Sequence, residues 1–115
     1  MLKSLKHEQV ILASSAPWRS EVLSRLQIKH KAIKPRYIEP PFGDGSIEAH
    51  VQELAKGKAQ SLERDFPNAI LIGADQMCVL EHDVMGKPGS AEAARQQLAK
   101  LSGRKHRLVG GLCVI

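Results

Sequence analysis

The stretch from residue 70 to residue 88 holds the residue types and spacing best suited to chemistry on a phosphate ester. An apolar run, predicted to form a strand over 69–74, ends at a single acid, Asp75. A carboxylate at the end of a buried strand costs free energy unless it binds a cation or hydrogen-bond donors. A second short strand then leads back to Lys87, whose ammonium can bind phosphate oxygens as a compact positive charge. Together these two residues predict a phosphate-ester site that uses a metal ion.

A second candidate anion site lies where the first expected strand meets the first expected helix. Ser14 or Ser15 is suited to cap this helix, and Pro17 is suited to its first turn. Free backbone amides and the dipole at a helix N-terminus attract phosphate. Ser14 could add a hydroxyl, and Arg19 a charge-assisted guanidinium contact. A capped helix with a solvated arginine explains the same residues, and on this signal alone it is the favoured interpretation.

Three further residues have both a structural and a functional interpretation. Trp18 is spaced with Val22 and Leu26 to anchor a core, but it also falls in the first helical turn, where a base could stack on it. Lys58 interrupts the apolar face of a long helix, and a lysine that snorkels from the edge of that face explains it equally well. Glu39, just before two prolines, is by default a solvated loop acid.

The elements that must position these residues alternate between strands and helices. Strands are predicted over 10–14, 31–37, 69–74 and 106–115, with a hairpin turn at 81–83. Helices are predicted to start at Pro17, after a cap at Ser46 and after a cap at Ser90, and Gly103 is expected in a left-handed conformation after the last helix. This alternation predicts an α/β layered fold, and 115 residues predict a single domain.

Composition and charge narrow the function classes. The apolar fraction of 43% and charged fraction of 25% are typical of a soluble globular protein, and the net charge of +5 favours polyanionic partners. Neither a signal peptide nor a membrane span is predicted, and Cys78 and Cys113 read as reduced thiols, so we expect a cytoplasmic protein without a membrane partner. The 17 basic residues are scattered and aromatic residues are few, so no nucleic-acid partner is expected.

Four blocks of sequence resemble the Maf family of nucleoside triphosphate pyrophosphatases. They are Leu-Ala-Ser-Ser-Ala-Pro-Trp-Arg at 12–19, Leu-Ala-Lys-Gly-Lys-Ala at 54–59, Ile-Gly-Ala-Asp-Gln at 72–76 and Gly-Lys-Pro at 86–88. Their order is that of the family, and together they are far more specific than any one of them. Within the family, Pro17-Trp18-Arg19 and Asp75-Gln76 are most similar to the branch that acts on 7-methyl-GTP.

The resemblance implies a role for each matched residue. Asp75 would accept a proton, and Trp18 and Gln76 would help to set the specificity for the base. A divalent cation, Mg²⁺ or Mn²⁺, would be the cofactor. The phosphate-binding residues would be Arg19, Lys58 and Lys87, with Ser14 added from its place at the helix start, and the metal ligands would be Glu39 and Asp75.

The resemblance also implies a fold and an activity. We expect a Maf/ITPase-like mixed sheet flanked by helices, corresponding to the N-terminal portion of the family fold, with the second half absent. The expected reaction converts 7-methyl-GTP into 7-methyl-GMP and pyrophosphate. The alternative is a truncated, non-catalytic nucleotide-binding or interaction module. Such a module would form a homodimer through the apolar strand at 112–115, because an exposed apolar strand invites pairing.

Overall fold

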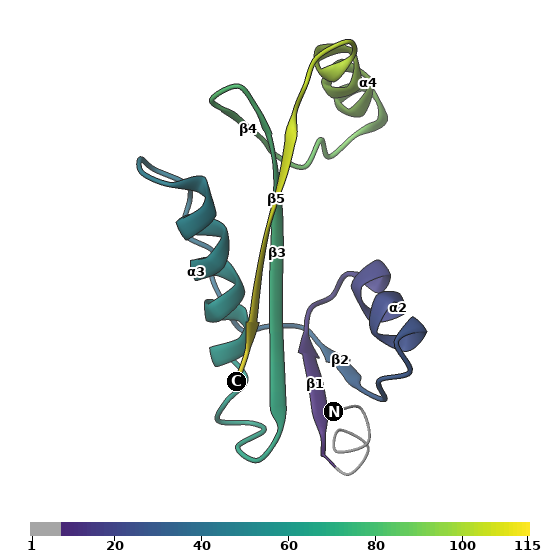
Figure 1. Cartoon of the computed structure of the whole chain (residues 1–115), viewed down its shortest axis with the longest axis vertical. Helices are drawn as coiled ribbons and strands as arrows, with labels where there is room; N and C mark the ends of the chain where they lie inside the picture. The colour runs from purple at the N-terminus through teal and green to yellow at the C-terminus, as the bar shows by residue number, and fades with distance from the viewer. Residues whose placement is uncertain (1–7) are drawn as a thin grey trace.

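The computed structural model describes residues 8–115 and shows a mixed α/β architecture (Figure 1). The elements, in chain order, are β1 (Val10–Ala13), α2 (Pro17–Arg25), β2 (Lys31–Ile33), α3 (Ile47–Gln60), β3 (Ile70–Leu80), β4 (Asp83–Met85), α4 (Ala91–Leu101) and β5 (Arg107–Val114). In the same range, no helix is long and apolar enough to cross a membrane.

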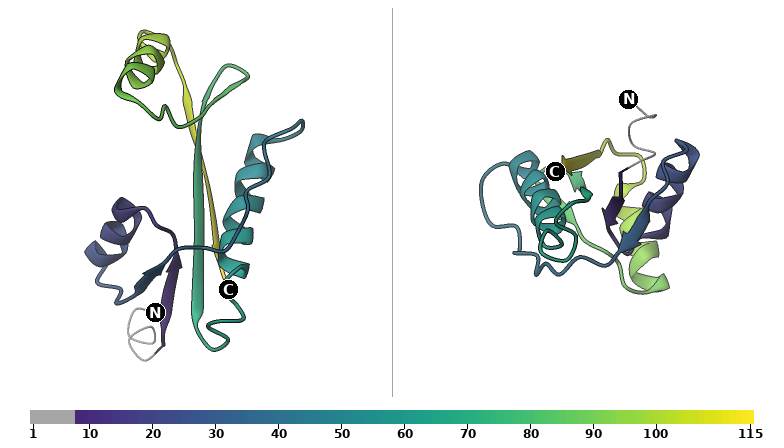
Figure 2. Two further views of the ribbon diagram at one scale, coloured as in Figure 1. Left: turned by 180° about the vertical axis from the view of Figure 1, so that it is seen from behind. Right: turned by 90° about the horizontal axis from the view of Figure 1, so that it is seen from below.

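The five strands form one mixed sheet in which β3 is central. The order is β2-β1-β3-β4, and β5 joins the other edge of β3. β1 pairs in parallel with β2 and with β3, whereas β4 and β5 pair antiparallel with β3. Helices α2 and α3 lie on opposite sides of these strands in both the front view and the view from below (Figures 1 and 2). The predicted mixed sheet flanked by helices is confirmed.

The length of β3 differs from the prediction. It continues to Leu80 rather than ending at Ala74, so Asp75 lies in the middle of the strand and not at its end. The cause is the long ladder with β5, in which Asp75 pairs with Gly111 and the pairing extends from Ile72 to Val79. Backbone hydrogen bonds to β5 hold this segment extended on both sides of the acid.

Helix α3 packs closely on β3 and β5 because both strands have a glycine beneath it. Its buried stripe contains Val51, Leu54, Ala55 and Ala59. A Cβ atom at Gly73 would overlap the carbonyl oxygen of Ala55, and one at Gly111 would lie 2.6 Å from the carbonyl oxygen of Val51. The helix backbone therefore rests directly on the sheet. Lys58 belongs to this face and is carried into the interior with it.

Two predictions for helix α2 are wrong. Val22 and Leu26, expected to face a core, are 50% and 53% exposed, and no residue of α2 is buried. The residue that caps α2 is Ala16, without a side-chain hydrogen bond. Ser14 instead accepts a 3.0 Å hydrogen bond from the Ala16 amide, before the helix begins.

Other local signals were correct. The hydroxyls of Ser46 and Ser90 accept hydrogen bonds from the amides of Ala49 and Ala93, which caps α3 and α4. Gly103 has a φ of +72°, as expected for the residue after a helix. The second strand is shorter than predicted and ends at Ile33 rather than near residue 37.

Candidate active site

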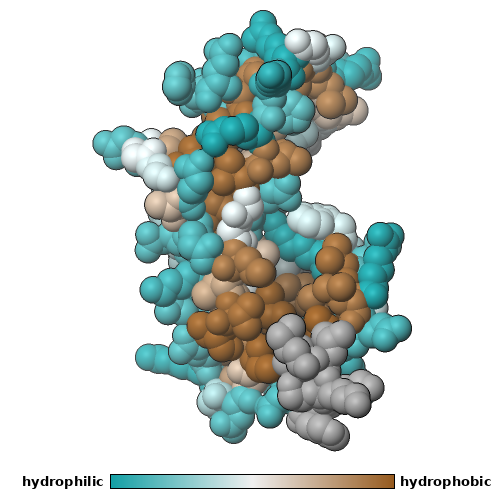
Figure 3. All heavy atoms as spheres, viewed as in Figure 1, coloured by the Kyte–Doolittle hydropathy of each residue, from teal (hydrophilic) through white to brown (hydrophobic). Residues whose placement is uncertain are grey.

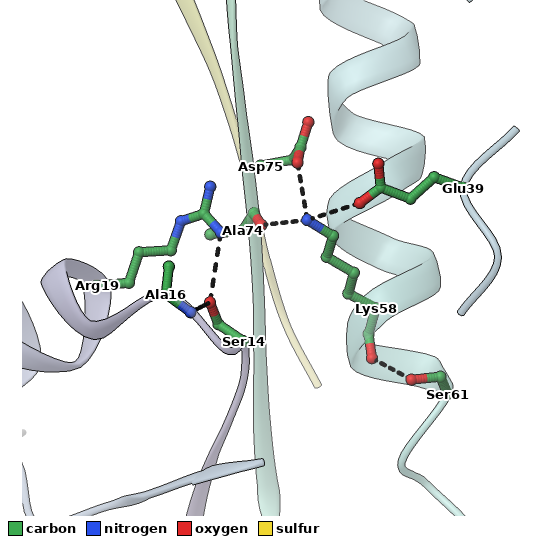
Figure 4. Close-up of polar contacts among 8 residues, drawn as sticks. All are labelled: Ser14, Ala16, Arg19, Glu39, Lys58, Ser61, Ala74 and Asp75. Atoms are coloured by element: carbon green, nitrogen blue, oxygen red, sulfur yellow. Dashed lines mark hydrogen bonds and ion pairs between the residues drawn. The ribbon is translucent and has the colours of Figure 1, made fainter. Parts of the chain in front are cut away.

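Lys58 is the centre of a charged cluster between α3 and β3 (Figure 4). Its Nζ lies 2.8 Å from Asp75 Oδ1, 3.1 Å from Glu39 Oε1 and 3.5 Å from the carbonyl oxygen of Ala74. The side chains of Lys58 and Asp75 are only 10% and 11% exposed. An ammonium group has three N–H donors, so these three acceptors satisfy it completely.

This geometry decides between the two interpretations of Lys58. A snorkelling lysine would hold its amine in water, whereas here the amine is buried against two carboxylates, so that interpretation is wrong. The Glu39 side chain is 49% exposed, yet it is tied to Lys58 and is not a free loop acid. A charge in the interior is tolerated when it is paired and hydrogen-bonded, as Lys58 and Asp75 are.

A second polar group lies at the start of α2, on the other side of β3 (Figure 4). Arg19 Nη1 donates a 3.4 Å hydrogen bond to Ser14 Oγ. The guanidinium carbon of Arg19 lies 4.6 Å from the centroid of the Trp18 ring. Trp18 is 52% exposed, so the expectation that it anchors the core is wrong.

A pocket of about 220 Å³ lies between α2 and the sheet, next to the Arg19 group, and neither Lys58 nor Glu39 is in its lining. Trp18 and Arg19 from α2, and Asp75 and Gln76 from β3, are part of its lining, and apolar side chains from β1, β3, β5 and α2 complete it. Figure 3 shows apolar surface gathered in the same half of the molecule, over the strands and on the facing side of α2. An apolar pocket with an aromatic ring and a guanidinium in its lining suits a ring system that has an anionic tail.

Lys87 is not brought to Asp75. Pairing between β3 and β4 runs only from Leu80 with Asp83 to Cys78 with Met85, so the hairpin ends before it reaches the level of Asp75. Lys87 is exposed, and within residues 8–115 no ion pair joins it to an acid. The expected position of Lys87 beside the acid is therefore not seen.

Comparison with known proteins identifies the family. A family model described as Maf-like protein matches residues 9–115, which is nearly the whole chain. The chain belongs to the Maf-like family. It is 37% identical over 107 residues to a protein named 7-methyl-GTP pyrophosphatase from Chromohalobacter salexigens. The match covers 93% of this chain and 55% of that protein, so the Maf-like chain spans about half the length of this curated relative.

The carboxylates of the Maf-like chain fit one mode of metal binding. Among the residues that the structure describes, no group of three or more His, Cys, Asp or Glu side chains could hold a metal ion. Glu39 and Asp75 nevertheless converge on one amine, and Lys58 contacts one oxygen of each. Mg²⁺ is commonly held by one or two carboxylates together with water and substrate phosphates. These two acids suit that mode and not a cage made by protein alone.

The Ser20–His30 pair is a feature of the Maf-like chain that sequence reasoning missed. Ser20 Oγ lies 2.7 Å from His30 Nε2, and His30 Nδ1 lies 2.8 Å from the carbonyl oxygen of Ile28. Because a carbonyl only accepts, Nδ1 carries the proton and Nε2 accepts from the serine hydroxyl. The pair ties the helix that carries Trp18 to the segment leading into β2. The two residues are ten positions apart and form no recognisable motif.

One clear pKa shift lies away from the pocket, at the start of α3. The pKa of Glu48 is lowered, first by a hydrogen bond from its own backbone amide and then by hydrogen bonds from Arg107 and Ser46. Arg107 Nη1 lies 2.9 Å from Glu48 Oε1, which links α3 to β5.

Proposed function

We propose that this chain provides the nucleotide site of a pyrophosphatase that converts 7-methyl-GTP into 7-methyl-GMP and pyrophosphate. The observation that carries the proposal is the charged cluster of Asp75, Lys58 and Glu39 on the α3 side of β3, together with the pocket on the α2 side that Trp18, Arg19 and Asp75 help to line. The printed name of the Chromohalobacter salexigens relative supports the same substrate class. Removal of such a modified nucleotide before it enters RNA or DNA is the role that we infer.

Asp75 would accept the proton from a water molecule that attacks the α-phosphorus. The bond between that phosphorus and the bridging oxygen breaks, and pyrophosphate leaves with the bonding electrons. Lys58 Nζ lies 2.8 Å from Asp75 Oδ1, and this contact would orient the carboxylate toward the attacking water. A divalent cation, Mg²⁺ or Mn²⁺, held by Glu39 and Asp75, would neutralise phosphate charge and polarise the reacting centre.

The basic residues would bind the triphosphate and stabilise charge on the leaving group. Arg19 can form a bidentate contact with phosphate oxygens, and Ser14 lies next to it. Lys58 would reach the phosphates by exchanging its contact with Glu39, the most exposed charged partner it has. Lys87 would complete the set from the segment after β4. Positive charge placed where negative charge develops lowers the barrier to the reaction.

The pocket beside Asp75 would hold the base. Methylation at N7 makes guanine cationic, and a cation over an indole face gains roughly 0.5–2 kcal/mol. Trp18 offers such a face because it lines the pocket and is 52% exposed. Gln76, an exposed amide in the same lining, can hydrogen-bond to the edge of the base.

Trp18→Arg is expected to reduce the preference for 7-methyl-GTP over GTP by roughly 2- to 30-fold, the factor that corresponds to loss of the cation–π gain. The measurement is kcat/KM for both nucleotides. Trp18→Phe is the matched control, because it keeps an aromatic face and should retain part of the preference. An unchanged preference in Trp18→Arg would rule out the indole as a sensor of base charge.

The direct test of the proposed function is the set of products formed from 7-methyl-GTP with Mg²⁺ or Mn²⁺. We expect equal amounts of 7-methyl-GMP and pyrophosphate. Release of inorganic phosphate would show attack at a different phosphorus and would contradict the proposal. Nucleotide binding without any product would favour the second candidate function.

The second candidate is a non-catalytic binding module that dimerises through β5. In its favour, Leu108, Leu112 and Val114 of this strand are each more than half exposed. The outer edge of β5 is nevertheless engaged at one point by Gln52 of α3. Its side-chain amide donates to the carbonyl oxygen of Leu112 at 2.8 Å and accepts from the Leu112 amide at 3.2 Å. A second copy of the strand would have to displace Gln52.

If β5 is the dimer interface, Gln52→Ala should strengthen self-association by roughly tenfold, because it frees two backbone groups whose hydrogen bonds are worth about 0.5–1.5 kcal/mol each. Sedimentation equilibrium measures the dimer dissociation constant. Gln60→Ala, at an exposed position on the same helix, is the matched control. A protein that stays monomeric with either substitution is not a module of this kind.

A further inference from the structure

The aromatic ring that would recognise a cationic base already has a cation beside it. The Arg19 guanidinium carbon is 4.6 Å from the centroid of the Trp18 ring, and both residues line the same pocket. Arg19 also donates to Ser14 Oγ at 3.4 Å, so its guanidinium contacts both the indole and Ser14. The Arg19 guanidinium therefore occupies a position next to the indole, where the base of the proposed substrate would stack.

A guanidinium and a cationic base both interact with the electron-rich face of the indole. If the base takes the face that Arg19 covers, the two exclude each other sterically. If the base takes the opposite face, two positive charges share one ring and repel each other across it. In either arrangement, a stacked Arg19 weakens the binding of a cationic purine more than that of a neutral one.

We propose that Arg19 is an internal competitor for the Trp18 ring, and that a bound polyphosphate tail releases the ring by drawing Arg19 away. This inference rests on the proposed function and concerns how its site selects substrate. Contacts between a guanidinium and phosphate are charge-assisted and bidentate, and they are stronger than a cation–π contact at an exposed ring. Ser14, to which Arg19 donates a hydrogen bond, lies where the phosphates are proposed to bind.

The consequence is that the charge of the base and the presence of the phosphates are recognised jointly. A nucleoside leaves Arg19 on the ring, so methylation at N7 should improve its binding little. A triphosphate removes Arg19, so methylation should improve its binding more. Such coupling is reciprocal: methylation must strengthen phosphate binding by the same factor by which the phosphates strengthen discrimination.

Trp18 is the only tryptophan in the chain, and its fluorescence therefore reports on this ring alone. Titrations would use guanosine, 7-methylguanosine and the α,β-methylene triphosphates of both, which cannot release pyrophosphate. For the wild-type chain, we expect the methylation preference to be roughly two- to five-fold greater for the triphosphates than for the nucleosides.

Arg19→Gln should change the two ligand classes in opposite directions. We expect 7-methylguanosine to bind roughly two- to five-fold more tightly, because its competitor is gone. The methylated triphosphate should bind roughly 10- to 150-fold more weakly, because charge-assisted hydrogen bonds are lost. Arg19→Lys keeps the charge for the phosphates and stacks less well, so it should gain nucleoside affinity while retaining most triphosphate affinity.

Arg25→Gln is the matched control, since Arg25 lies on the same helix but pairs with Glu21 at 2.8 Å. It should leave all four affinities unchanged. If Arg19→Gln and Arg19→Lys both weaken 7-methylguanosine, or leave it unchanged, Arg19 is not a competitor and the inference fails while the proposed function stands. If the wild-type chain binds neither triphosphate, the proposed function fails, and the inference that rests on it fails as well.

Discussion

Asp75→Asn is expected to lower the rate of pyrophosphate release from 7-methyl-GTP by roughly 10²- to 10⁴-fold, the range typical of losing a general base. The amide has the shape of the carboxylate, and its oxygen can still accept the hydrogen bond from Lys58, but it cannot take a proton from water. Nucleotide affinity should therefore change much less than the rate. Single-turnover release of pyrophosphate at saturating nucleotide measures the chemical step directly.

The matched control for this change is Asp83→Asn. Asp83 lies in the same hairpin, its side chain is 69% exposed, and its nearest cation, Lys100, is 3.7 Å away. It should retain wild-type turnover. Activity within threefold of wild type in Asp75→Asn would show that another group accepts the proton, and the assignment of Asp75 would then be wrong.

Lys58→Met is expected to lower the free energy of unfolding by about 3–5 kcal/mol, as is typical when one partner of a buried ion pair is removed. Methionine fills a similar volume but leaves the Asp75 carboxylate buried without its ammonium partner. Urea denaturation followed by circular dichroism measures the loss. Lys56→Met, at an exposed position two residues earlier on α3, should change stability by no more than about 0.5 kcal/mol.

A double variant separates the buried charge from general loss of packing. Adding Asp75→Asn to Lys58→Met removes the unpaired carboxylate, so most of the lost stability should return. Glu39→Gln should lower the free energy of unfolding by about 1 kcal/mol or less. The Glu39 side chain of the wild type is half exposed, so its ion pair with Lys58 is weakened by solvent. A Lys58→Met protein as stable as wild type would mean that the ion pair contributes nothing to the fold.

The two experiments also distinguish a residue that stabilises the fold from one that takes part in the reaction. The double variant is expected to be folded, since no unpaired charge remains, and inactive, since no base remains. Lys58 would then be a residue that orients Asp75, with any phosphate contact made by exchange of Glu39. Three acceptors within the chain already satisfy its amine, so we expect its main role to be the orientation of Asp75 and not direct binding of phosphate.

The order and type of the elements could be predicted from the sequence because their signals are local. The caps at Ser46 and Ser90 and the left-handed Gly103 depend on hydrogen bonds and backbone angles within a few residues. The apolar stripe of α3 follows from helical spacing alone. The linked blocks that indicated the family are likewise a property of residue types and their order, and the family match over residues 9–115 agrees with them.

The arrangement of the site depended on residues far apart in the chain. Asp75 lies within β3 because β5, more than thirty residues later, pairs along it. Lys58 contacts both Glu39 and Asp75 because Gly73 lets α3 approach the strand. The spacing of residues along the sequence does not predict such a contact. Propensity and periodicity describe a residue's neighbours in sequence, whereas burial and ion pairing depend on what tertiary packing places across from it.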